Sequence, residues 1–187
     1  TDGANWKDNT GWLGEVGTEC DWFGVACLSG TVTQLILYSN SLNGSIPREI
    51  GNLTGLTILN LSNNTLSGII PSEIGNLTSL TYLSFFTNSI TGAIPREIGN
   101  LTKLTTLQLA ANSLSGSIPS TIGNLTNLTF LGLWTNQLSG SIPRELGNLT
   151  GLTSRNLSNN TLSGMIPSEL GKLTKLEQLL LGDGERN

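Results

Sequence analysis

The chain has 187 residues, a net charge of −4 and no histidine, and only 12% of its residues are charged. Nucleic-acid binding needs a basic surface, and a membrane span needs roughly 20 consecutive apolar residues, and the sequence contains neither. The commonest general base and metal ligand is also absent, so the composition predicts a protein that is not an enzyme and has no cofactor or metal.

Residues 1–30 differ in composition from the rest and form the expected N-terminal cap. This segment holds all the cysteines of the chain, Cys20 and Cys27, in the run Cys-Asp-Trp-Phe-Gly-Val-Ala-Cys. Two cysteines without histidine fall short of the four ligands of a structural zinc site. No signal peptide is visible and the first residues already look like a cap, so we expect a mature or trimmed chain.

From residue 31 onward the sequence repeats every 24 residues. Each repeat carries one proline at the same place, namely Pro47, Pro71, Pro95, Pro119, Pro143 and Pro167. Self-similarity of this length with leucines at fixed offsets predicts a solenoid, in which stacked units share one core. We expect residues 31–187 to form about six full units and a partial last unit, without a C-terminal cap.

Within the unit that starts at Leu53, alternation predicts a short strand with Leu59 and Leu61 pointing inward. Leu66, Ile70 and Ile74 are expected to point inward from the return path. An asparagine recurs where the chain leaves each strand and is expected to satisfy backbone groups there, as an internal ladder: Asn40, Asn64, Asn88, Asn112, Asn136 and Asn160. A glycine recurs at a bend that a side chain would obstruct: Gly44, Gly68, Gly92, Gly116, Gly140 and Gly164.

The pattern Leu-x-x-Leu-x-Leu-x-x-Asn-x-Leu-x-Gly-x-Ile-Pro resembles the plant-type, extracellular class of leucine-rich repeat. That class includes plant receptor ectodomains, secreted inhibitors of wall enzymes, and secreted algal and bacterial proteins. The resemblance implies an α/β solenoid: a right-handed superhelix with a concave parallel sheet, a second short sheet near Leu-Ser-Gly, and convex 3₁₀ turns. The cysteine motif resembles the cap of this class, which implies a secreted or extracellular protein with a Cys20–Cys27 disulfide over Trp22.

In the first six units the outward strand positions of the concave face carry no charge, so this part of the face cannot steer a charged ligand electrostatically. Aromatic residues occur on it at regular intervals: Tyr38, Tyr82, Phe86, Phe130 and Trp134. Their spacing also fits simple inheritance from a 48-residue duplication. Exposed aromatics are enriched at recognition surfaces, so we expect these five to bind a protein or peptide ligand. Strand spacing predicts that Phe86 and Trp134 lie roughly 10 Å apart.

Two alternative functions remain open. Aromatic planes beside amides suit sugar rings, which favours a glycan-binding protein. Threonines in register favour an ice-binding, antifreeze-type protein, and they form one file from Thr57 to Thr153 and a second at Thr54, Thr78, Thr102, Thr126, Thr150 and Thr174. The recurring Gly-Asn-Leu-Thr also makes five glycosylation sequons, at Asn52, Asn76, Asn100, Asn124 and Asn148.

Two positions break the repeat. Arg155 stands where the other units have an inward leucine, so we expect a locally distorted strand. At the C-terminal end, Gly184 replaces the ladder asparagine and Leu180 is expected on an open edge strand. This predicts a trimmed chain or an end-to-end contact over Leu176, Leu179 and Leu181.

Overall fold

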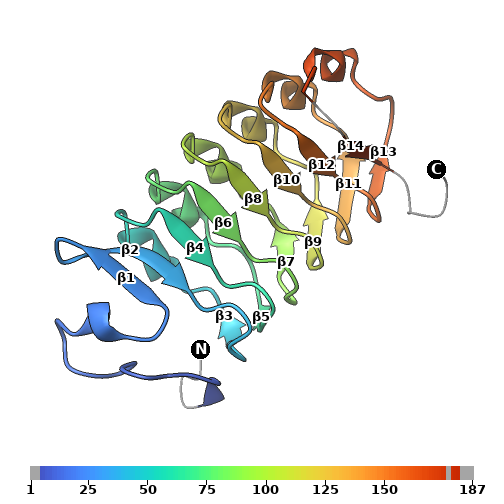
Figure 1. Ribbon diagram of the computed structural model, residues 1–187. Coiled ribbons are helices and arrows are strands. Elements are labelled where there is room, and N and C mark those ends of the chain that lie inside the picture. The colour runs from blue at the N-terminus through green and yellow to red at the C-terminus, as the bar shows by residue number, and fades with distance from the viewer. Residues whose placement is uncertain (1–4, 176–177, 182–187) are drawn as a thin grey trace.

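The computed structural model describes residues 5–175 and 178–181, and it is a solenoid of short strands and 3₁₀ turns (Figure 1). The main sheet has eight strands: β1 (Val25–Leu28), β2 (Thr31–Ile36), β4 (Ile58–Asn60), β6 (Tyr82–Ser84), β8 (Thr106–Gln108), β10 (Phe130–Gly132), β12 (Ser154–Asn156) and β14 (Gln178–Leu180). The described residues contain no α-helix.

The main sheet follows the order of the repeats along the chain. β1 and β2 pair antiparallel, and every later neighbour pairs parallel at a register step of one unit, as in Leu59 with Leu83 and Leu83 with Leu107. Parallel neighbours need a crossover connection, and here the rest of each repeat supplies it. Equivalent residues of successive units therefore stand in rows across the sheet.

A second row of short strands follows the turn out of each main strand: β3 (Asn43–Ser45), β5 (Thr65–Ser67), β7 (Thr91–Ala93), β9 (Ser113–Gly116), β11 (Gln137–Ser141) and β13 (Thr161–Ser163). They form a two-stranded and a four-stranded parallel sheet, where the family resemblance implied one second short sheet near Leu-Ser-Gly. Gly92 and its equivalents in the other units have positive φ, a conformation that glycine adopts at no steric cost.

The return path of each unit is a single 3₁₀ turn: η3 (Arg48–Asn52), η4 (Ser72–Asn76), η5 (Arg96–Asn100), η6 (Ser120–Asn124), η7 (Arg144–Asn148) and η8 (Ser168–Lys172). The recurring proline precedes each turn in extended conformation, which suits its fixed φ. A further turn, η2 (Glu19–Asp21), lies in the cap. The turns stack closely: a Cβ placed on Gly99 would stand 2.5 Å from the backbone oxygen of Thr121 in the next turn.

One continuous apolar core runs the length of the solenoid. Leu59, Leu66 and Ile74 are fully buried, and Leu61 and Ile70 nearly so, which confirms the predicted inward positions. The equivalent leucines and isoleucines of the other units continue the same columns. Since no single unit could cover its own apolar face, the stack has to fold as a whole.

The asparagine ladder is confirmed and links consecutive units. Asn64 Oδ1 accepts hydrogen bonds from the backbone N–H groups of Asn40 and Leu42, at 3.0 and 2.9 Å. Its Nδ2 donates to the carbonyls of Leu37, Leu61 and Ser62. One amide therefore satisfies backbone groups of two units that would otherwise be buried and unpaired.

The cap docks on the first rung of the same ladder. Asn40 Oδ1 accepts a hydrogen bond from the Asp8 N–H, and Asn40 Nδ2 donates to the Asp8 carbonyl. The predicted disulfide between Cys20 and Cys27 is present, with an S–S distance of 2.08 Å.

Three tryptophans in the cap contact one another in series. The Trp12 ring lies 4.8 Å from Trp6 and 5.0 Å from Trp22, measured between centroids. Trp6 and Trp12 pack against the core, whereas Trp22 packs on Trp12 and donates its indole N–H to Thr18 Oγ1. The tryptophan beside the cysteines is therefore one layer removed from the core.

The two breaks in the repeat lie at the C-terminal end. The backbone of Arg155 keeps its register, paired with Leu131 and Leu179, so the expected distortion does not reach the strand pairing. The side chain of Arg155 is outside the described structure, as are Leu176, the side chain of Leu179, and Gly184. Leu181 packs against the core.

Candidate ligand-binding face

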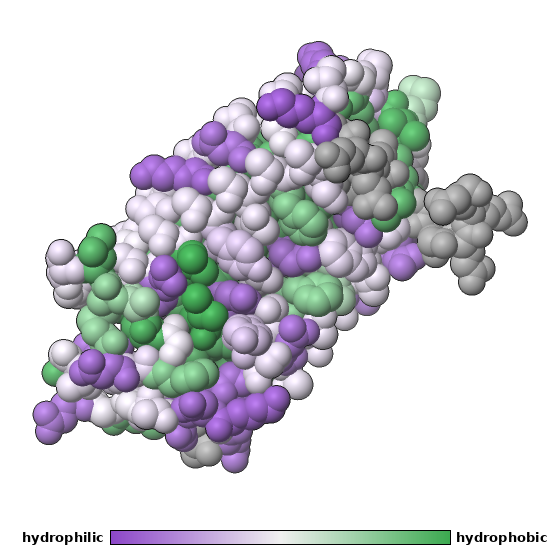
Figure 2. All heavy atoms as spheres, viewed as in Figure 1, coloured by the Kyte–Doolittle hydropathy of each residue, from purple (hydrophilic) through white to green (hydrophobic). Residues whose placement is uncertain are grey.

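The outward side of the main sheet, called here the sheet face, combines half-buried side chains with deeply covered ones. Alternation along each strand puts one leucine in the core and the next residue on this face. Figure 2 shows the face as hydrophobic patches separated by polar side chains. Several outward strand positions, which we expected to be exposed, are buried instead: Ser62, Ser84, Ala110, Gly132 and Ser158.

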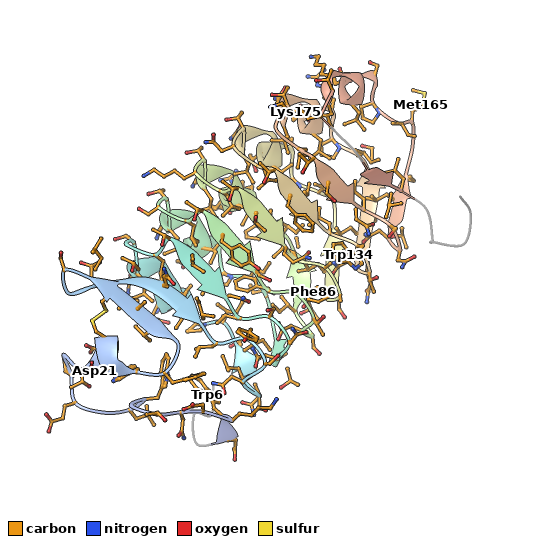
Figure 3. The ribbon with its side chains drawn as sticks, viewed as in Figure 1. Trp6, Asp21, Phe86, Trp134, Met165 and Lys175 are labelled. Atoms are coloured by element: carbon orange, nitrogen blue, oxygen red, sulfur yellow. A yellow bond between two sulfur atoms is a disulfide. The ribbon has the colours of Figure 1, made fainter. Side chains whose placement is uncertain are left out.

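Three of the five predicted aromatic residues form one continuous cluster. The ring centroids of Phe86 and Trp134 are 5.8 Å apart, and those of Phe130 and Trp134 are 6.4 Å apart. Figure 3 shows Phe86 and Trp134 next to each other on the sheet face. Tilted and edge contacts at these distances stabilise aromatic pairs beyond the area that they bury.

The predicted separation of roughly 10 Å between Phe86 and Trp134 is wrong. Their backbones are two units apart, but Ala110 lies between them and is 0% exposed, since a methyl group leaves space for both rings to lean inward. The two rings therefore make a single aromatic surface over Ala110. No ligand side chain fits between them.

The two tyrosines stand outside this cluster. Tyr82 pairs in register with Thr106, and Thr106 with Phe130, so Tyr82 and Phe130 occupy the same row on either side of β8. Tyr38 lies near the cap and is 58% exposed. Neither tyrosine makes a ring contact with another aromatic residue among those that the structure describes.

Two residues that sequence reasoning missed shape the cluster. A Cβ on Gly132 would collide with Gln108 Oε1 and would stand 2.6 Å from the Trp134 ring, so these two side chains use the space that the missing Cβ leaves. Gln108 Oε1 is buried there without a hydrogen-bond partner in the described structure. A glycine inside a strand signals close approach of another group, and this signal could have marked the site.

Several of the described charges form ion pairs on the 3₁₀ turns. Arg48, Arg96 and Arg144 pair with the glutamate that follows each of them, at 3.1–3.3 Å. A hydrogen bond from its own backbone N–H, and then one from Arg96, lowers the pKa of the Glu97 carboxyl. The described residues contain no group of three metal-ligating side chains, and no described helix is long and apolar enough to cross a membrane.

The two threonine files differ in their hydrogen bonding. In the file on the main sheet, each hydroxyl donates to the carbonyl of the preceding threonine, as in Thr81 to Thr57 and Thr105 to Thr81, at 3.0 and 2.9 Å. The other file, which includes Thr102, is exposed throughout and follows the 3₁₀ turns. Directly before it lie the five sequon asparagines, all of them exposed: Asn52, Asn76, Asn100, Asn124 and Asn148.

The comparisons with known proteins agree with the repeat fold. The family described as "Leucine-rich repeat region" matches residues 72–185, and single leucine-rich repeats match residues 31–53 and 55–77. This chain belongs to the leucine-rich repeat family.

Three solved structures illustrate the range of its relatives. The GASSHO1/SCHENGEN3 ectodomain of Arabidopsis thaliana, in complex with CASPARIAN STRIP INTEGRITY FACTOR 2, is 43% identical with a TM-score of 0.78; the match covers 79% of this chain and 18% of that one. A chain of the BIR3–SERK2 complex from the same plant is 37% identical with a TM-score of 0.72, and 82% of each chain is covered. A plant ice-binding protein is 32% identical with a TM-score of 0.76, and the match covers 88% of this chain and 62% of that one.

Proposed function

We propose that this chain is an extracellular recognition module that binds a peptide or protein segment across the strands of its sheet face. The observation that carries the proposal is the continuous surface of Phe86, Phe130 and Trp134, on a face whose outward positions are uncharged in the first six units. Aromatic side chains at the centre of an interface commonly provide most of its binding energy. An extended ligand would lay its apolar groups on these rings and hydrogen-bond to the surrounding hydroxyls and amides.

The relatives support this proposal at the level of ligand class. The GASSHO1 ectodomain is bound to CASPARIAN STRIP INTEGRITY FACTOR 2, and another relative belongs to the BIR3–SERK2 complex. The disulfide in the cap suits an oxidising, extracellular compartment. For this chain we propose only the class of ligand, a protein or peptide, and no catalysis. The identity of the relatives' ligands is not extended to it.

The test compares the native chain with a Phe86→Ala/Trp134→Ala double variant. Immobilised proteins are exposed to secreted proteins of the source organism, and captured partners are titrated by surface plasmon resonance. Loss of central aromatic anchors typically costs 2 kcal/mol or more, so we expect binding to weaken at least about thirtyfold. Equal binding by the native chain and the double variant would contradict the proposal.

Glu73→Ala on a 3₁₀ turn is the matched control. Its carboxylate lies on η4, away from the sheet face, and its removal should leave the affinity for the captured partner unchanged. Circular dichroism and thermal melting of all three proteins establish that they fold alike. If Glu73→Ala weakened binding of the partner as much as the double variant does, the binding surface would lie on the 3₁₀ turns.

Ice binding is a second candidate, favoured by the exposed threonine file and by similarity to a plant ice-binding protein. Threonines one unit apart repeat at the strand spacing of about 4.8 Å, which makes a regular array of hydroxyl and methyl groups. The file on the main sheet is less suited, because its hydroxyls already donate to backbone carbonyls.

Thermal hysteresis measurements test this candidate with Thr102→Lys/Thr126→Lys, which places two charged side chains in the exposed file. Hysteresis that disappears in this variant, and persists in the control Ser67→Lys on the second sheet, would support ice binding. A native chain without hysteresis and without inhibition of ice recrystallisation would exclude it.

A further inference from the structure

We propose that a cavity between the N-terminal cap and the first repeat units binds an uncharged aromatic molecule of about two fused rings. The cavity lies at the N-terminal end of the apolar core and has a volume of about 270 Å³. Its lining combines Trp6 and Trp12 of the cap with leucines and isoleucines of the first two units. These side chains belong to the core and the cap, so the site is separate from the aromatic cluster on the sheet face.

The cavity arises because the cap covers the core differently from a repeat unit. The sequence Pro-Arg-Glu-Ile-Gly-Asn is the same around Ile50 and Ile98, yet Ile98, inside the stack, is 0% exposed and Ile50, in the first turn, is 8% exposed. Inside the stack, each unit interdigitates with the leucines and isoleucines of its neighbours. At the N-terminal end, Trp6 and Trp12 pack against the core instead (Figure 3). Two large flat rings do not fill the spaces between branched aliphatic side chains, so volume remains between them.

The lining of the cavity is almost wholly apolar. Leu42, Ile46 and Leu66 contribute to it, and Ser45 and Glu49 are the polar residues among those that line it. An engineered apolar cavity of about 150 Å³ binds benzene, so a cavity of this size has room for roughly two fused rings. Pockets lined by hydrophobic and aromatic side chains, with few polar groups, are typical of small-molecule sites.

The lining also selects the chemistry of the ligand. The rings of Trp6 and Trp12 meet edge to face, with centroids 4.8 Å apart and an angle of 68° between their planes. Aromatic ligands gain from tilted and edge contacts with such rings. The carboxylate of Glu49 in the lining disfavours an anion, and a cation would lose its hydration among the apolar side chains. An uncharged aromatic ligand meets neither cost.

The test titrates two probes into the isotope-labelled chain and follows the indole N–H signals by NMR. Naphthalene has the expected size and no charge, and naphthalenecarboxylate adds a negative charge to the same rings. We expect the Trp6 and Trp12 signals to shift at lower naphthalene concentration than the Trp134 signal, because both rings line the cavity. Affinity for the carboxylate should be at least about tenfold lower.

Three outcomes of this titration would overturn the proposal. The first is that the Trp6 and Trp12 signals do not shift up to the solubility limit of naphthalene. The second is that the Trp134 signal shifts first, which would place the naphthalene on the sheet face. The third is equal affinity for the charged and the uncharged probe.

A variant that fills the cavity tests its position. Ile50 lines the cavity, so Ile50→Phe should weaken naphthalene binding by at least about tenfold and leave the melting temperature close to that of the native chain. The matched control is Ile98→Phe, in the same local sequence but fully buried; overpacking should lower its melting temperature, and its naphthalene affinity should stay native. If Ile50→Phe proved unstable, Leu42→Phe, at another lining position, replaces it. Undiminished binding by a folded cavity-filling variant would refute the site.

The result can be separated from that of the proposed function. Naphthalene binding that persists in Phe86→Ala/Trp134→Ala would support a cavity site distinct from the sheet face, whatever that variant does to a protein partner. A protein partner is the competing occupant of the cavity, because it has apolar side chains of its own. If the partner captured by the native chain displaced naphthalene, the cavity would belong to the protein interface and the small-molecule site would be refuted.

Discussion

The sheet face and the 3₁₀ turns are built from the same six repeats but differ in how far their side chains vary. On the turns, Pro-x-Glu-Ile-Gly-Asn recurs with few changes, and Gly99 has the backbone of the next turn 2.5 Å from where its Cβ would stand. On the sheet face, one row contains Tyr38, Ser62, Phe86, Ala110, Trp134 and Ser158. Backbone packing dictates the residues of the turns, whereas strand hydrogen bonds accept almost any outward side chain. Specificity can therefore vary on the sheet face while the fold stays the same.

The largest expected effect comes from the asparagine ladder, which links consecutive units beside the main sheet. Asn112 Oδ1 accepts from the Ile90 N–H, and Asn112 Nδ2 donates to the carbonyls of Phe85 and Leu109. Asn112→Ala leaves several of these groups unpaired at about 1–3 kcal/mol each, so we expect unfolding free energy to fall by at least about 3 kcal/mol in urea titrations. Asn124→Ala, on an exposed turn position, is the control and should change it little. A small loss for Asn112→Ala would show that water replaces the amide.

Gly99→Ala tests whether backbone contact fixes the turn sequence. The added methyl group would collide with the Thr121 backbone, and overpacking of this kind typically costs about 1–3 kcal/mol. For Gly171, in the last turn, no described atom lies within 4 Å of a Cβ, so Gly171→Ala should be nearly neutral. The melting temperatures of the two variants measure these losses. Equal losses would mean that glycine is needed for a reason other than contact with the next turn.

Arg155→Leu tests the core side of the sheet. The backbone pairs Arg155 with Leu131 and Leu179, in a row that is leucine in the other units. Restoring leucine should stabilise the fold by about 1–3 kcal/mol through recovered apolar burial, measured by thermal or urea unfolding. A lower melting temperature would reveal an interaction of the arginine that the substitution destroys.

The smallest effect separates the two threonine files. Thr105→Val removes one hydroxyl that donates to the Thr81 carbonyl, and we expect a loss of about 0.5–1 kcal/mol in unfolding free energy. Thr102→Val, in the exposed file, should have no measurable effect on stability. A loss at Thr102 equal to that at Thr105 would mean that the exposed hydroxyls also support the fold and are less free for ice.

Sequence predicted most of the fold because each repeat position meets the same surroundings six times. The inward leucines and the asparagine ladder follow from the repeat and are confirmed, and the 3₁₀ turns that the family resemblance implied are present. The recurring glycines were expected where a side chain would collide, but a Cβ on Gly116, Gly140 or Gly164 would make only ordinary contacts, and positive φ is what favours glycine there. The disulfide between Cys20 and Cys27 followed from resemblance of the cap. The five aromatic residues also lie on the expected face, although their role in binding remains a prediction.

Predictions failed where neighbouring side chains interact across strands. The spacing of Phe86 and Trp134 was estimated from the backbone, and their rings close that distance because Ala110 between them is small. Gln108 and Gly132 were expected on the outward face, but no role in the cluster was assigned to them, because that role depends on the Trp134 ring beside them. In the cap, Trp6 and Trp12 reach the core while Trp22 packs on Trp12, and no repeat pattern specifies that order.

The sequence by itself determined the stacking of 24-residue units, the uncharged face and the positions of its aromatic residues, since periodic local patterns fix which side chains face the core. Only the tertiary structure decided which aromatic rings touch and which outward positions are covered. The physical reason is that packing on the face depends on the size of side chains one and two strands away. Those neighbours are 24 and 48 residues distant in the chain, and their contacts exist only once the units have stacked.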